Sequence, residues 1–173
     1  MKNICIIGFG SIGKYVFKNL IQDNIKIKSL ICRHGREKEG KQALGSNLEI
    51  YNSINDFKDY PDIILDCAGH SALKDHASKA LLKGINFITL SSGALCDKKL
   101  YSDIKNSEKK GQAKFIIAPG AIGSLDILSS ASNGGIYAVN YVGRKPPEGW
   151  LGSRAEKVID LQKLGNKPKV HYP

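Results

Sequence analysis

The start of the chain holds the feature that most constrains its fold, an apolar run from Asn3 to Ile7 followed at once by Gly8-Phe9-Gly10-Ser11-Ile12-Gly13. Apolar residues then recur with helical spacing at Val16, Phe17, Leu20 and Ile21. In such a strand, turn and helix, the first glycine permits a tight turn, the second lets the backbone approach a pyrophosphate, and the third lets the helix pack on the strand. The phosphates rest on free N–H groups at the helix N-terminus. We therefore predict a dinucleotide site contacted by Gly8, Gly10, Ser11, Ile12 and Gly13.

Strand-like and helix-like segments continue to alternate as far as residue 118. We predict strands over residues 25–31, 48–51, 62–66, 86–90 and 114–118. Helices are expected over 72–82 and 98–109, closed by Gly84 and Gly111, with a brief helix near 54–57. The polar stretch from Arg33 to Gly45 carries no predicted element. Alternation with short connections is typical of an α/β fold, here a Rossmann-type doubly wound parallel sheet.

The pattern changes after residue 122. We expect a helix over 125–132, a strand over 136–143 and a helix over 155–164, with prolines and glycines breaking the periodicity in between. The predicted organisation is a dinucleotide-binding domain over residues 1–122 and the start of a second, incomplete α+β domain over 123–173. Strand 136–143 would leave an unpaired apolar edge that invites association, so a homodimer is one expectation.

Composition argues against several classes of protein. No apolar stretch approaches the roughly 20 residues that a membrane-spanning helix requires, and the N-terminal apolar run lacks the features of a signal peptide. The four cysteines stand singly, which predicts small buried side chains in a reducing compartment and no metal site. The net charge of +10 is scattered and has no interleaved aromatics, so no nucleic-acid partner is expected. The expectation is a soluble cytoplasmic protein whose positive field attracts anionic ligands.

The end of the second predicted strand bears on the choice between the two nicotinamide cofactors. A carboxylate at this point would bond the ribose 2′-hydroxyl and repel a 2′-phosphate. The chain instead has Arg33 and Arg36, and guanidinium groups fork phosphates well. We predict NADP in preference to NAD, the alternative being that both arginines are ordinary solvent-exposed loop residues.

Three loops that follow predicted strands are rich in small residues, namely 67–70, 91–94 and 119–121. Ligands of open parallel sheets bind beyond the carboxyl ends of the strands, so these loops meet at one edge, where a flat ring can lie against the backbone. The candidate cofactor contacts added here are Arg33, Ala68, Gly69, His70, Ser91 and Ala121.

Four segments together make the sequence similar to a known family. They are Asp66 to Ala72, Ser91 to Asp97, Pro119 to Asp126 and Gly143 to Trp150, in this order. The chain resembles the L-aspartate dehydrogenase family from Ile4 to about Leu164. The resemblance implies reversible oxidative deamination of L-aspartate to iminoaspartate, with hydride passing to NAD or NADP, and a supply of iminoaspartate for NAD biosynthesis. It also implies a small anionic substrate and a contact between Ala121 and the dinucleotide.

The resemblance leaves the catalytic residue unassigned. Family members continue with an Asn-rich segment and a catalytic histidine, for which the chain has no counterpart before Pro173, so a truncated form is expected. His70 is the best local candidate because histidine transfers protons near neutral pH; pocket lining is the preferred alternative. His34 is placed near the adenosine end and His76 within a helix. Arg144 and Lys145 are interpreted as structural or interface residues, with substrate carboxylate binding as the alternative.

Two other functions remain open at this point. One is a catalytically inactive dinucleotide-binding module. The other is a related oxidoreductase, such as a homoserine dehydrogenase or dihydrodipicolinate reductase, that shares only the first domain. The order of the four segments argues against the related oxidoreductase.

Overall fold

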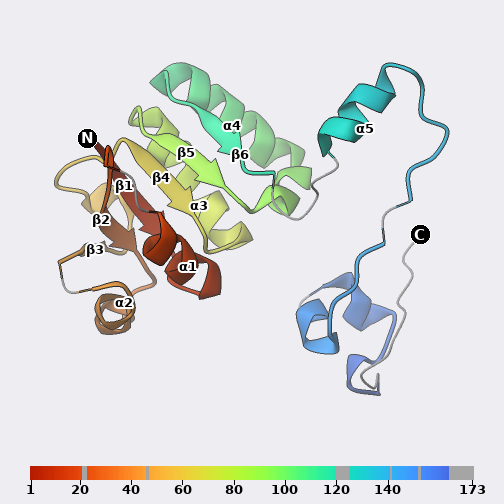
Figure 1. Cartoon of the computed structure of the whole chain (residues 1–173), viewed down its shortest axis with the longest axis horizontal. Helices are drawn as coiled ribbons and strands as arrows, with labels where there is room; N and C mark the ends of the chain where they lie inside the picture. Colours follow the sequence, from red (N-terminus) through yellow and green to blue (C-terminus); the bar gives the residue numbers. More distant parts are fainter. Residues whose placement is uncertain (21–22, 46, 120–124, 141, 152, 164–173) are drawn as a thin grey trace. The chain divides into compact units, whose positions relative to one another are not determined.

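The computed structural model describes residues 1–20, 23–45, 47–119, 125–140, 142–151 and 153–163. The chain divides into two compact units, Met1–Gly123 and Ser124–Pro173, which are described separately (Figure 1).

The first unit is built on a six-stranded sheet in the order β3-β2-β1-β4-β5-β6, and every pair of neighbours is parallel. The strands are β1 Lys2–Ile7, β2 Ile25–Ile31, β3 Glu49–Tyr51, β4 Ile63–Asp66, β5 Asn86–Thr89 and β6 Phe115–Ile117. Sequence order runs outward in both directions from β1, as in doubly wound folds. The predicted Rossmann-type sheet is confirmed.

Helices cover both faces of this sheet, and a cluster of buried apolar side chains lies on each face. The helices are α1 Ser11–Asn19, α2 Glu37–Leu44, α3 His70–Leu82 and α4 Lys98–Gly111, with 3₁₀ helices η1 Ile54–Asp56 and η2 Ser92–Cys96. Alternate residues of β1 point to opposite faces. Ile7 belongs to the buried cluster that includes residues of α3 and α4, and Ile6 belongs to the cluster on the side of α1 and α2. Because both faces are buried, β1 has the continuous apolar sequence expected of a central parallel strand.

Helix α2 is the element that the sequence analysis missed. It begins after Arg36 and buries only Gly40 and Leu44, so its sequence lacks an apolar stripe. Gly40 explains how so polar a helix docks on the sheet, since a Cβ there would lie 2.8 Å from a methyl carbon of Leu30. Acidic Glu37 and Glu39 in the first turn complement the helix dipole.

The ends of α3 and α4 correct one of the two predicted glycine caps. Gly84 follows α3 with a left-handed φ of 77°, as predicted. Gly111 does not terminate α4, because the helix includes it and the left-handed residue is Gln112. The reason for a glycine at 111 is close packing: a Cβ there would lie 1.7 Å from the Leu81 carbonyl oxygen, so α4 meets α3 backbone to backbone.

The second unit departs from the sequence prediction more widely. Helix α5 spans Leu125–Ser132, as predicted. The expected strand 136–143 is absent over its described residues, which leave out residue 141. Over the described residues 155–163, the expected helix 155–164 is replaced by 3₁₀ helices η4 Arg154–Lys157 and η5 Leu161–Lys163, and another, η3, spans Pro147–Trp150. A single extended segment is not stable without a neighbouring strand, and short helices need a packing partner.

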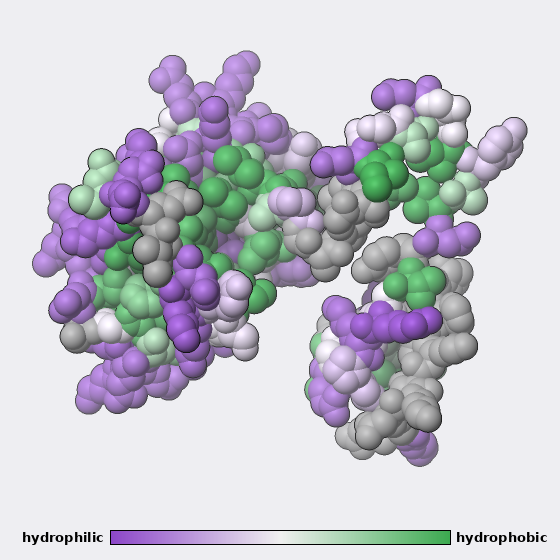
Figure 2. Space-filling model, viewed as in Figure 1, coloured by the Kyte–Doolittle hydropathy of each residue, from purple (hydrophilic) through white to green (hydrophobic). Residues whose placement is uncertain are grey.

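Apolar side chains of this unit are correspondingly exposed. Tyr137, Val139 and Val142 are all more than half exposed, and so is Ile127 of α5, where Figure 2 shows hydrophobic residues on the surface. The strand edge on which the homodimer expectation rested is therefore not formed, although apolar surface is present at the same segment.

Two of the four cysteines meet the expectation of burial. Cys5 and Cys32 are buried, Cys67 is half-buried and Cys96 is exposed. Burial raises the pKa of the Cys5 thiol to about 12. Within the described residues, no three His, Cys, Asp or Glu side chains are grouped so as to hold a metal ion, and none of the helices found there is long and apolar enough to cross a membrane.

Candidate functional site

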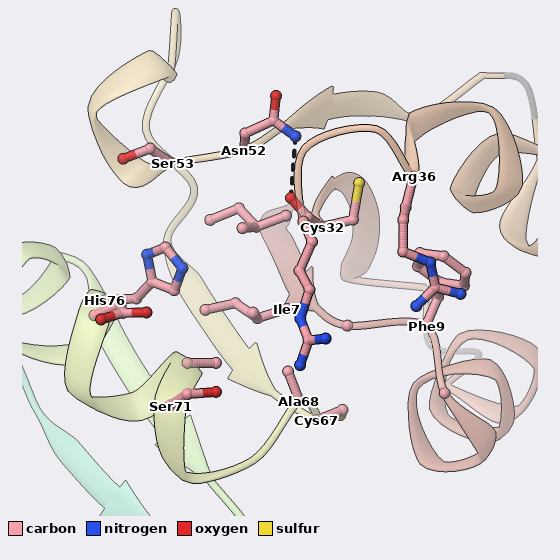
Figure 3. A pocket seen from close by; sticks show the side chains of 16 residues that line it. Ile7, Phe9, Cys32, Arg36, Asn52, Ser53, Cys67, Ala68, Ser71 and His76 are labelled. Atoms are coloured by element: carbon pink, nitrogen blue, oxygen red, sulfur yellow. Dashed lines mark hydrogen bonds between the residues drawn. The ribbon is translucent and has the colours of Figure 1, made fainter.

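A cavity of about 440 Å³ opens at the carboxyl ends of β1, β2 and β4. This is the point where the strand order reverses, and open α/β sheets bind ligands there. Its wall comes from five stretches of chain: 7–10 at the end of β1, 31–33 and 36 at the end of β2, 52–53 after β3, 67–68 after β4, and residues 71, 72, 75 and 76 of α3 (Figure 3).

The turn after β1 is shaped by its three glycines. Gly8 has a left-handed φ of 86°, and a Cβ there would lie 2.8 Å from the Cβ of Ala68. A Cβ on Gly13 would lie 2.2 Å from the Gly8 carbonyl oxygen, so only glycine lets α1 start this close to β1. A Cβ on Gly10 would meet nothing within 4 Å. Gly8 and Gly13 thus serve packing, whereas Gly10 leaves open space beside the cavity.

The N-terminus of α1 is free of side-chain capping. Gly10 precedes the helix, and no side-chain cap hydrogen bond is made at this end by the residues that the structure describes. Ser11 lines an adjoining hollow together with Lys14, and the Ile12 side chain is exposed. The turn therefore offers uncapped backbone donors and a nearby cation, which suit an anionic group.

The two arginines after β2 differ in their surroundings. The Arg36 guanidinium lies 4.6 Å from the centre of the Phe9 ring and donates to Glu39 from Nε at 3.0 Å and Nη2 at 2.6 Å. The hydrogen bond with Glu39 raises the pKa of Arg36. Arg33 also lines the cavity and makes no ion pair within the described residues. Arg33 is therefore the cation available to a ligand, while Arg36 is engaged by a carboxylate.

Asn52 ties the segment after β3 to the loop after β2. Its Nδ2 donates to the Cys32 carbonyl oxygen at 3.0 Å, the bond drawn in Figure 3, and to Glu37 Oε1 at 2.9 Å. His34, placed near the adenosine end by the sequence analysis, is exposed and lies outside the cavity, with Nδ1 3.4 Å from Asn52 Oδ1. The Asn52 bonds fix one rim of the cavity.

A buried carboxylate holds the loops after β4 and β5. Asp66 is 1% exposed and accepts from the Ala68 N–H at 3.0 Å and from the Thr89 hydroxyl at 2.8 Å. Thr89 Oγ1 in turn accepts from the Ser91 N–H at 2.9 Å. Ala68 also packs closely against Gly8 in the turn after β1. Asp66 therefore links the loop after β4 to the loop after β5 through Thr89, and to the turn after β1 through Ala68. The sequence placed Asp66 at the end of a strand and at the start of a segment similar to L-aspartate dehydrogenases, but did not predict these hydrogen bonds.

Burial affects the thiol next to this carboxylate. Cys67 is half-buried and lines the cavity. Burial, followed by the nearby charge of Asp66, raises the pKa of its thiol to about 11. Cys67 is therefore a neutral, weakly reactive wall residue at physiological pH.

The predicted site residues separate into groups. Gly8, Gly10, Arg33 and Ala68 line the cavity, and Gly13 is buried against Gly8. Gly69, His70 and Ser91 lie outside the cavity wall: Gly69 precedes α3, His70 begins it, and Ser91 is buried beside Thr89. The His70 ring meets Gly93, where a Cβ would lie 3.0 Å from its Nε2. Ala121 lies outside the described residues.

Sequence analysis missed one side of the cavity, formed by polar residues of α3 and the segment after β3. These are Asn52, Ser53, Ser71, Asp75 and His76. The signal was present, because 71, 72, 75 and 76 fall on one face of a helix. Burial lowers the pKa of His76, and its Nδ1 is buried without a hydrogen-bond partner among the described residues. A polar face on a helix packed against a sheet is an indication of a ligand pocket.

Known proteins are similar to this chain in sequence and in fold. The family model described as "Homoserine dehydrogenase, NAD binding domain" matches residues 8–118. The chain belongs to this family of NAD-binding domains. Its match begins at Gly8, directly after β1, and ends just after β6, so it covers the other five strands and all the residues that line the cavity except Ile7.

Relatives with curated names extend over nearly the whole chain. An L-aspartate dehydrogenase of Ruegeria pomeroyi is 38% identical over 169 residues, covering 98% of this chain and 60% of that protein. One of Pseudomonas aeruginosa is 35% identical over 167 residues, covering 95% of this chain and 62% of that protein. The predicted resemblance to L-aspartate dehydrogenases is confirmed. The chain spans about six tenths of the length of these relatives.

Solved structures agree on the fold. The crystal structure of an aspartate dehydrogenase from Thermotoga maritima matches with a TM-score of 0.62 at 23% identity, over 88% of this chain and 60% of that one. The WlbA dehydrogenase from Bordetella pertussis, solved with NADH and UDP-GlcNAcA, matches with a TM-score of 0.65 at 12% identity, over 88% and 50%. Identities this low establish the dehydrogenase-type fold alone.

Proposed function

We propose that this chain carries the dinucleotide-binding part of an NAD(P)-dependent L-aspartate dehydrogenase. The observation that carries the proposal is the cavity at the reversal of strand order, bounded by the glycine turn and Arg33. Similarity to L-aspartate dehydrogenases over 95–98% of the chain supplies the reaction class. The proposed reaction moves a hydride from the α-carbon of L-aspartate to the nicotinamide and releases one proton, giving iminoaspartate.

The residues present fit a dinucleotide. Open space at Gly10 and the uncapped start of α1 suit a pyrophosphate, and the adjoining cavity has room for an adenosine. When bound, the cofactor supplies the hydride acceptor. We propose that Gly8, Gly10, Ser11, Ile12 and Gly13 hold its phosphates, with Ala68, Gly69, His70, Ser91 and Ala121 toward the nicotinamide.

We propose that NADP is preferred over NAD. Arg33 faces the cavity without an ion pair among the described residues, and no carboxylate lines the cavity at the end of β2 to bond a ribose 2′-hydroxyl. Arg33 would then hold the 2′-phosphate first, with Arg36 assisting once it leaves Glu39.

Residues 1–122 are proposed as the dinucleotide domain and 123–173 as the start of the substrate domain. A small anionic substrate, a cytoplasmic location and a supply of iminoaspartate for NAD biosynthesis complete the proposal, with no nucleic-acid or membrane partner. Association into a homodimer would use the exposed apolar side chains of Ile136, Tyr137, Val139 and Val142. Light scattering tests the dimer, and a monomer at high concentration would contradict it.

The activity is tested with NADPH in the presence of oxaloacetate and ammonia, beside NADH. Oxidation of NADPH would establish that this chain suffices for the reaction and would make His70→Ala the next variant. If NADPH binds without turnover, the chain is a binding module. If NADH binds and NADPH does not, the proposed preference for NADP is wrong. If neither dinucleotide binds, the proposed function is wrong.

A further inference from the structure

Two neighbouring residues of α3, Asp75 and His76, line the cavity on the side away from the proposed phosphate contacts. Figure 3 shows the His76 ring extending from α3 toward Ser53, with Phe9 and Arg36 on the opposite side of the cavity. A dinucleotide with its pyrophosphate at Gly10 and its ribose near Arg33 would place its base against this face of α3. The proposed function assigns nothing to the base.

The surroundings of His76 fix which of its nitrogens can meet a ligand. Nδ1 is buried and has no partner among the described residues, so Nε2 is the nitrogen left for the cavity. Burial lowers the pKa of His76 even though Asp75 and Asp66 act to raise it, and Lys79 acts in the same direction as burial. The ring is therefore neutral at pH 7 and carries one proton.

The position of that proton follows from hydrogen bonding. A buried N–H without a partner is rarer than an acceptor without one. Nδ1 is therefore the unprotonated nitrogen of the ring, and Nε2 carries the proton and can donate a hydrogen bond. The tautomer is set by the burial of one side of the ring, before any ligand binds.

Asp75 supplies the complementary group. Its carboxylate is exposed, lines the same cavity and makes no ion pair within the described part of the chain. An ionised carboxylate only accepts hydrogen bonds. Asp75 and His76 together thus present an acceptor beside a donor at one wall of the cavity.

We propose that His76 and Asp75 read the base of the dinucleotide and select adenine over 6-oxopurines. The inference rests on the proposed binding of NAD(P) in this cavity. Adenine offers a 6-amino donor beside the N1 acceptor, so Asp75 accepts from the amino group and His76 Nε2 donates to N1. Hypoxanthine and guanine have O6 and N1–H at these positions, which places an acceptor against Asp75 and a donor against His76. Sites built to pair a polar edge reject the wrong partner strongly.

The test measures dissociation constants of the full chain for NADPH and for its hypoxanthine analogue, using the fluorescence of the reduced nicotinamide. The expected preference for the adenine form is about tenfold or more. The hypoxanthine form loses both hydrogen bonds, and it sets O6 against the Asp75 carboxylate and N1–H against the His76 N–H. Asp75→Asn provides an amide that can donate to O6 and should reduce the preference to about twofold. His76→Phe keeps the ring, removes the donor and should weaken NADPH binding while leaving the analogue little changed.

Asp103→Asn is the matched control, because Asp103 is an exposed carboxylate on α4 outside the cavity; it should keep the full preference. Asp75→Asn alters an exposed side chain, so the test does not depend on His76→Phe folding. Equal affinity of the unmodified chain for both dinucleotides would overturn this inference and leave the proposed function standing. Absence of binding to either of these dinucleotides and to NADH would overturn both.

Discussion

The two sides of the cavity differ in which part of the chain forms them, the backbone on one side and side chains on the other. The glycine side is made by the backbone: Gly8 fits against Ala68, Gly13 fits against Gly8, and Asp66 holds the neighbouring loop through an N–H group. The α3 side is made by side chains, with Asp75 and His76 on a regular helix. Substitutions on the glycine side should therefore destabilise the fold, whereas substitutions on the α3 side should alter which ligand is preferred.

The largest effect is expected at Gly13. In Gly13→Ala the new Cβ would meet the Gly8 carbonyl oxygen at 2.2 Å, and neither backbone can yield easily. We expect a loss of about 3 kcal/mol or more in the free energy of unfolding, measured by urea denaturation, because overpacking against backbone is among the severe mechanisms.

Gly10→Ala is the matched control, since its Cβ meets nothing within 4 Å. Its stability should stay within about 1 kcal/mol of the unmodified chain, while NADPH affinity falls because the methyl group occupies the proposed pyrophosphate space. Equal destabilisation by the two substitutions would remove the distinction between the packing glycines and the open one.

Asp66→Asn comes next in size. The carboxylate accepts two hydrogen bonds in a buried position, and an amide group places a donor where one of these donors now points. A decrease of about 1–3 kcal/mol in the free energy of unfolding is expected, together with weaker NADPH binding as the loops after β4 and β5 loosen. Asp103→Asn in the same denaturation assay should have little effect, and an unchanged Asp66→Asn would show that the link between loops is unimportant.

The arginine side offers a pair of opposite changes in cofactor affinity. Arg33→Ser should weaken NADPH binding about tenfold and leave NADH binding nearly unchanged, because only NADPH carries the 2′-phosphate. Glu39→Gln should tighten NADPH binding by about two- to fivefold, since it releases the Arg36 guanidinium from its carboxylate partner. Fluorescence titration with both dinucleotides measures each ratio. Parallel changes for NADH in either variant would contradict a 2′-phosphate contact.

The smallest effect concerns pH. Burial lowers the pKa of His76 below its ordinary value of 6.5, so the unfolded chain takes up the proton more readily than the folded chain. Stability is therefore unaffected by this residue above about pH 7 and falls as the pH drops through 6.5. Urea denaturation at several pH values should show a shallower acid decline in His76→Phe. An identical decline in both proteins would mean that His76 titrates normally.

The same contrast explains what the sequence could predict. Gly8, Gly10 and Gly13 were found because a backbone turn leaves a fixed spacing in the sequence. Asp75 and His76 were missed because a helix face facing a ligand looks like any polar surface until the helix is placed on the sheet. Helix α2 was missed for a related reason, since it buries only two residues.

Other errors came from packing that local patterns do not record. Gly111 looked like a helix end, but its role is the close contact with Leu81. Strand 136–143 had the right alternation and no strand to pair with among the described residues, so it did not form. Local pattern predicts an element only where the rest of the fold supplies its partner.

The proposed function requires that NADPH binds in the cavity at the reversal of strand order. The most direct test is the change in backbone amide NMR spectra of the full chain on addition of NADPH. The account predicts shifts in the turn after β1, the loop after β2 and the α3 face that includes Asp75 and His76. Absence of shifts, or shifts confined to residues 125–163, would contradict it.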